Sequence, residues 1–183
     1  MKHRNFTEMK DALQYVPIAK DRHALLNFNF RNHGQPASVK HLLGELGFGL
    51  EFRSLNNAVS AKLEPDTWSE KGFAITVNSN HHVLRQRFSA LHEIAHYYLH
   101  SPDHDFLAPP KHRSLVGSNA FIYSAQETIE EKEANEWAES VIFGQRALEG
   151  AVGLFGLDLE ALSFHFGFSI DVMQIALRKR ELL

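Results

Sequence analysis

The chain has 183 residues, of which 44 % are hydrophobic and 22 % are charged, and its formal net charge is -3. This length fits one ordinary domain with a proper core, and the composition is that of a globular protein rather than a disordered or fibrous one. The small negative charge argues against strong non-specific binding to nucleic acid. The sequence contains no cysteine, which excludes disulfide scaffolds, thiolate metal ligands and cysteine nucleophiles and leaves imidazole and carboxylate groups as the strong metal ligands.

Nothing in the sequence predicts a targeting or membrane-spanning segment. Residues 1–17 lack the continuous apolar stretch of a secretory signal. No apolar run approaches the roughly 20 residues that cross a bilayer. We therefore expect a cytoplasmic protein with no membrane partner.

The first elements are expected to be helical. Residues 1–20 are mixed in character and predict no more than a loosely held segment. A short helix is expected from Asp21 to Phe30. Apolar residues at three- and four-residue spacing predict another helix over residues 36–47, and Gly47 ends it.

Two strands and two long helices follow. Residues 49–55 and 72–78 contain many aromatic and β-branched side chains and predict strands. A turn or short hairpin is expected between them, at residues 64–66. Amphipathic patterns predict long helices from Val83 to His100 and from Ala125 to Phe143.

The end of the chain has the pattern of a helix-turn-helix. Asp158 and Ser169 are expected to cap two short helices, with Gly167 in the turn between them. A few strands followed by several helices are typical of an α+β fold rather than a doubly wound sheet. We divide the chain into three parts: an N-terminal segment (1–20), a core (21–150) and C-terminal helices (151–183).

One five-residue pattern indicates the chemistry. His92-Glu93-Ile94-Ala95-His96 matches H-E-x-x-H, which places two imidazoles one helical turn apart, where both can reach one zinc ion. Glu93 is rotated by about 100° from His92, so it is better placed to act as general base on a bound water than to bind the ion. Several side chains are candidates for an additional oxyanion donor, and the sequence does not rank them: Tyr97, Tyr98, His104, His112 and Tyr123.

A catalytic zinc ion needs a third protein ligand, and His100 is an unsuitable one. It continues the four-residue series, but it lies about 12 Å along the helix axis from His92. With metal–nitrogen bonds of about 2.0–2.1 Å, three imidazoles spread over that length cannot meet at one ion. We expect His100 to lie beside the site as a supporting residue.

The third ligand should then be a carboxylate on the helix expected at residues 125–143. Glu133 and Glu136 lie off its apolar stripe and are expected to be solvated. Periodicity does not choose among the glutamates on or beside the stripe, which are Glu127, Glu130 and Glu131. Asn135 favours Glu131, because an amide four residues further along the same helix can hydrogen-bond a ligand histidine.

At this point the sequence resembles a family, the ImmA/IrrE zinc metallopeptidases. The matching stretches are, in order, ITVNSN, RQRFSALHEIAHYYLH and EKEANEWAESVI, and the likeness covers most of residues 24–183. The resemblance implies a zincin-like peptidase core, a small sheet with active-site helices, followed by a C-terminal helical pair. It also implies one zinc ion on His92, His96 and Glu131, with Glu93 as the catalytic glutamate.

Members of that family cleave helix-turn-helix repressors and so switch on stress, mobile-element or prophage genes. The resemblance therefore implies an endopeptidase whose partner is a helix-turn-helix transcriptional repressor.

Two other interpretations stay open. One is a DNA-binding regulator built on Arg178-Lys179-Arg180, although basic residues at a helix end more often interact with the helix dipole, so direct DNA binding is not expected. The other is a peptidase fold that only binds a protein, as in an antirepressor or toxin–antitoxin pair.

Overall fold

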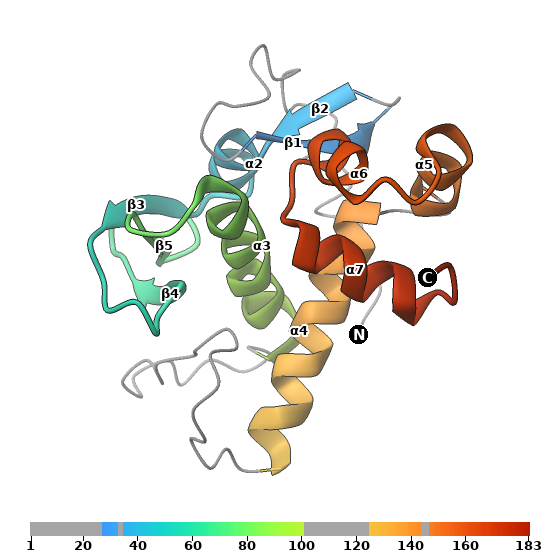
Figure 1. Cartoon of the computed structure of the whole chain (residues 1–183). Helices are drawn as coiled ribbons and strands as arrows, with labels where there is room; N and C mark the ends of the chain where they lie inside the picture. The colour runs from blue at the N-terminus through green and yellow to red at the C-terminus, as the bar shows by residue number, and fades with distance from the viewer. Residues whose placement is uncertain (1–26, 33–34, 101–124, 144–146) are drawn as a thin grey trace.

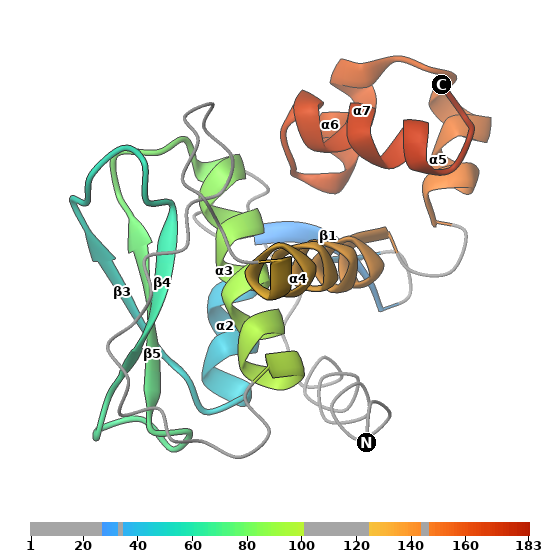
Figure 2. The ribbon, with the colours of Figure 1, turned by 90° about the horizontal axis from the view of Figure 1, so that it is seen from below.

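The helix with the H-E-x-x-H pattern, α3 (Val83–His100), lies between a small sheet and a second long helix, α4 (Ala125–Phe143) (Figures 1 and 2). The structure is a computed structural model, and it describes residues 27–32, 35–100, 125–143 and 147–183. The fold is α+β, as predicted, with a small sheet, the two long helices and C-terminal helices. The other elements are β1 (Asn27–Asn32), β2 (Gln35–Ser38), α2 (Val39–Glu45), β3 (Gly49–Arg53), β4 (Ala61–Pro65), β5 (Phe73–Asn78), α5 (Ala147–Phe155), α6 (Leu159–Phe166) and α7 (Ile170–Lys179).

A three-stranded sheet in the order β3-β5-β4 covers one side of α3. β3 runs parallel to β5, and β4 runs antiparallel to β5 with Leu63 opposite Ile75. The predicted strands at β3 and β5 are confirmed, and the turn predicted near Pro65 is the end of β4, which forms a hairpin with β5. Ile75 and Val77 are fully buried in the same apolar cluster as Ile94 of α3, so the central strand fixes the position of the site helix.

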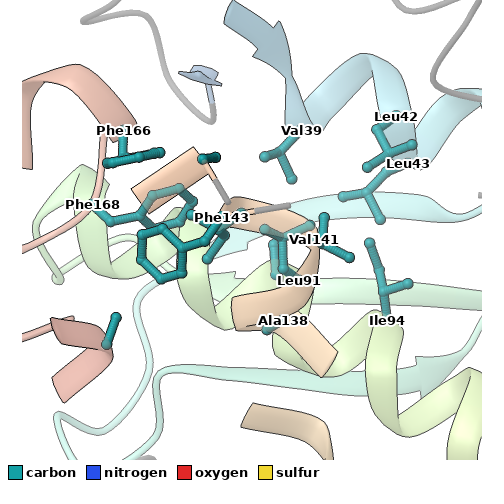
Figure 3. Packing of buried hydrophobic residues seen from close by; sticks show 14 of the residues in the cluster. Val39, Leu42, Leu43, Leu91, Ile94, Ala138, Val141, Phe143, Phe166 and Phe168 are labelled. Carbon is teal, nitrogen blue, oxygen red and sulfur yellow. The ribbon is translucent and has the colours of Figure 1, made fainter. Parts of the chain in front are cut away.

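The other side of α3 packs against α4 along the apolar stripe that the sequence predicts. Ala134, Ala138, Val141 and Ile142 are all buried. Figure 3 shows Ala138 and Val141 beside Leu91 of α3. Both long helices have the predicted bounds.

The C-terminal helices belong to the same core. Asp158 caps α6 by accepting hydrogen bonds from two backbone N–H groups, and Gly167, with φ of 74°, ends it. Ser169 caps α7, so the predicted caps are confirmed. Phe166 packs edge-on against Phe143 of α4, with ring centres 5.0 Å apart, as Figure 3 shows.

The prediction of a helix from Asp21 to Phe30 is wrong over residues 27–30, the part of this range that the structure describes. Residues 27–32 form β1, which pairs with β2, and residues 36–38 belong to β2, so α2 begins only at Val39. The run Asn-Phe-Asn-Phe alternates polar and apolar residues, which is the period of a strand.

The predicted N-terminal segment and the predicted division of the chain are not tested by the structure. The segment at 1–20 lies outside the described residues. The division of the chain at residue 150 stays a prediction, and it falls inside α5, a helix that the sequence analysis did not predict. Of the helices that the structure describes, none has the length and apolarity needed to cross a membrane.

Candidate metal centre

The two histidines and the glutamate of the H-E-x-x-H pattern are almost completely buried, although all three side chains are polar. His92, Glu93 and His96 are 1 %, 3 % and 2 % exposed. The sheet and α4 cover α3 on opposite sides, so polar groups on these faces are removed from water. Buried groups of this kind are stable only with partners.

Glu131 on α4 meets both histidines. The two histidine Nε2 atoms lie 2.8 Å apart. Glu131 Oε2 lies 3.1 Å from Nε2 of His92, and Glu131 Oε1 lies 3.2 Å from Nε2 of His96. Ligand atoms of these three side chains all lie within 4.8 Å of one another, close enough to hold a metal ion.

Asn135, one turn further along α4, fixes the orientation of the His92 ring. The Nδ1–H group of His92 donates a hydrogen bond of 3.0 Å to Asn135 Oδ1. With the proton on Nδ1, the lone pair of the neutral ring is on Nε2, the atom that faces Glu131 and His96. Such a hydrogen bond selects the tautomer that binds a metal.

The charge of Glu131 is stabilised by its two histidine neighbours. Burial raises the pKa of the Glu131 carboxyl, but hydrogen bonds with His92 and His96 outweigh this effect and hold the pKa well below its usual range. The carboxylate therefore stays ionised, which is the form that binds a metal.

The other proposed ligands and neighbours are placed differently. His100 donates from Nε2 to the backbone carbonyl of Glu130 at 3.1 Å, and its Nδ1 lies 3.8 Å from a carboxylate oxygen of Glu133. The ring of His100 is next to that of His96, with centres 5.3 Å apart, so His100 lies beside the three-residue group without joining it. Of the three glutamates that periodicity left open, the structure brings Glu131 to the histidines.

The candidates for an oxyanion donor are only partly described. Tyr97 packs edge-on against Phe48, with ring centres 4.9 Å apart. Tyr98 is buried among aromatic side chains, including Trp137. His104, His112 and Tyr123 lie outside the described residues.

The chemistry of this group fits a metal ion. Two imidazole nitrogens and one carboxylate, all facing one another, are a ligand set of catalytic zinc sites. Three lone-pair atoms this close, on side chains removed from water, need a proton or a cation among them. A divalent ion can replace the imidazole protons, because metal binding releases protons from its ligands.

Comparison with known families agrees with this geometry. The sequence profile of the IrrE N-terminal-like domain, peptidase family M78, matches residues 47–178. The matched region runs from the start of the three-stranded sheet into α7 and contains all three residues of the group. The chain therefore belongs to this peptidase family. No curated protein matches the sequence.

Proposed function

We propose that this chain is a zinc-dependent endopeptidase that cleaves a helix-turn-helix repressor and so relieves repression. The observation that carries the proposal is the meeting of His92, His96 and Glu131 from two helices, with Glu93 buried beside His92 on the same helix. Membership of a peptidase family supports hydrolysis as the reaction.

His92, His96 and Glu131 are the residues that would hold the zinc ion. When bound, zinc acts as a Lewis acid toward the peptide carbonyl and lowers the pKa of a bound water. Asn135 keeps the His92 ring in the tautomer that leaves Nε2 available. Burial of the site excludes bulk water, which strengthens each of these electrostatic interactions.

Glu93 is the proposed general base. It lies outside the group of three, and its position on α3 is rotated by about 100° from that of His92. Its carboxylate accepts a proton from the attacking water as the new carbon–oxygen bond forms. The same proton then passes to the leaving nitrogen as the carbon–nitrogen bond breaks.

The C-terminal contacts weigh against the DNA-binding alternative. Lys179 Nζ lies 2.8 Å from a carboxylate oxygen of Glu139 on α4. Arg180 lies 3.4 Å from Glu149 and also covers the ring of Phe143. These basic side chains are engaged within the chain, whereas phosphate binding requires cationic groups that are free to neutralise phosphates. We therefore propose a repressor protein, rather than DNA, as the partner.

The test is cleavage of a helix-turn-helix repressor, the class of substrate that the proposal names, and the first one to use is any such repressor encoded beside the gene of this chain. We expect the purified protein to contain about one zinc ion per chain and to cut this repressor. Cleavage should stop after treatment with a chelator and should resume when zinc is restored. A sample that receives chelator already saturated with zinc is the matched control. Cleavage that continues at the same rate after complete zinc removal would contradict the proposal.

A further inference from the structure

We propose that Trp68 is an anchor with which this chain holds its protein substrate, at a surface separate from the metal centre. The identity of the substrate rests on the function proposed above. The anchoring role rests on the exposure of Trp68, on the rigidity of the turn that carries it, on the attachment of that turn to α3 and on the charges around it.

Trp68 is exposed to an unusual degree. Its side chain is 95 % exposed, the highest value among the large hydrophobic side chains that the structure describes. The other tryptophan, Trp137 of α4, is partly buried against the core. Tryptophan is mostly buried in folded proteins and is enriched among the residues that dominate binding at interfaces. Covering this exposed indole ring with a partner is therefore expected to be favourable, because it removes apolar surface from water.

The turn between β4 and β5 holds Trp68 on a well-defined backbone. Asp66 Oδ1 accepts a hydrogen bond of 3.0 Å from the backbone N–H of Trp68. The hydroxyl of Ser69 lies within hydrogen-bond distance of the carbonyls of Asp66 and Phe73, at 3.1 and 2.8 Å, and its single hydrogen can be donated to either. The backbone N–H of Asp66 donates to the carbonyl of Gly72 at 2.8 Å. A backbone ordered before binding reduces the entropy lost on binding, as is typical of an anchor residue.

The same turn is attached to the end of α3 that carries His96. The ring of Phe73, at the end of the turn, packs against that of Tyr97, with centres 5.7 Å apart. The Nζ atom of Lys71 lies 5.9 Å from the centre of the Tyr98 ring. Since Tyr97 directly follows His96 in the helix, a partner held at Trp68 is held next to the helix of the metal centre.

The charges near Trp68 indicate the kind of partner. Asp66 and Glu70 lie two residues before and after Trp68 in the same turn, whereas the Lys71 side chain is directed onto Tyr98. Anionic lipids attract basic segments, and single-stranded nucleic acid binds aromatic rings that lie in basic grooves. An aromatic side chain on an acidic turn instead fits a protein with an apolar pocket and a basic rim. A helix-turn-helix repressor has such basic surfaces, because it must neutralise DNA phosphates.

The experiment compares Trp68→Ala with Leu154→Ala. Leu154 is the matched control, because it is 75 % exposed but lies on α5, far along the chain from the turn. We expect Trp68→Ala to raise the KM for the intact repressor by about tenfold, as loss of an interface anchor does. The kcat, the zinc content and the cleavage of a short peptide spanning the cut site should not change. The Leu154→Ala protein should behave like the wild type in every assay.

A direct readout uses tryptophan fluorescence in the Glu93→Gln protein, in which the repressor is to stay uncut. Adding repressor should shift the emission to shorter wavelength, and Trp68→Phe should remove that shift. An equal KM for Trp68→Ala and wild type would contradict the anchoring role of Trp68. An emission shift with anionic vesicles and none with the repressor would contradict it as well. Binding of the repressor through Trp68 without cleavage would overturn the proposed function and leave the anchor standing. No binding to the wild type would overturn both.

Discussion

At the residue scale, the metal centre depends on a single carboxylate that the sequence did not single out by periodicity. Glu127, Glu130 and Glu131 all lay on or beside the apolar stripe of α4, and the choice of Glu131 rested on Asn135. The structure places Glu131 against both histidines and Asn135 against His92 Nδ1. Which glutamate of α4 reaches the histidines of α3 depends on how the two helices are rotated relative to each other. The spacing of residues along the sequence does not determine that rotation.

This placement predicts unequal zinc retention among the glutamates. Glu131→Gln should weaken zinc binding far more than Glu130→Gln, because only the first change removes a carboxylate oxygen from the group of three. The measurement is zinc content during competition with a chelator of graded concentration. His100→Ala should leave zinc bound at micromolar protein, because this ring contacts the Glu130 carbonyl and lies outside the group. Loss of zinc in the His100 variant and retention in Glu131→Gln would show that the ligand set is wrong.

At the scale of the elements, the two long helices and the strands β3 and β5 could be predicted from the sequence, whereas β1 was missed. α3 has the expected bounds because its apolar spacing continues over several turns, and α4 has them although its buried stripe is confined to residues 134–143. The polar–apolar alternation of residues 27–30 has the period of a strand, but four residues are a weak signal, and β1 is stabilised by pairing with β2, which local propensity does not report. The helix caps at Asp158 and Ser169 were predictable because capping is a local hydrogen bond.

α4 offers a test of the packing that holds Glu131 in place. Ile142 is 1 % exposed and Ile129 is 51 % exposed on the same helix. Ile142→Ala should lower the free energy of unfolding by about 2–5 kcal/mol, because it opens a cavity in the core. Ile129→Ala makes the same chemical change on the surface and should stay within about 0.5 kcal/mol of the wild type. Chemical denaturation of the zinc-free proteins measures both values, and equal losses would contradict the orientation of α4.

At the scale of the whole molecule, the two halves of the metal centre come from segments far apart in the chain. The fold brings them together because α3 packs against the sheet on one side and against α4 on the other, and the C-terminal helices continue the same core through Phe166 and Phe168 (Figures 1 and 3). Sequence analysis predicted the α+β class and the family through its motifs. It did not single out Trp68, because the exposure of a side chain and the hydrogen bonds of a turn appear only in three dimensions.

The central claim is that Glu93 performs chemistry beside a metal that other residues hold. The most direct measurement is cleavage of the proposed repressor substrate by wild type and by Glu93→Gln, with zinc quantified in both. Glutamine keeps the size of the side chain but cannot accept the proton of water, so zinc content and fold should be unchanged while the cleavage rate falls by about 10²–10⁴-fold. Equal cleavage by the two proteins at equal zinc content would contradict the hydrolytic mechanism.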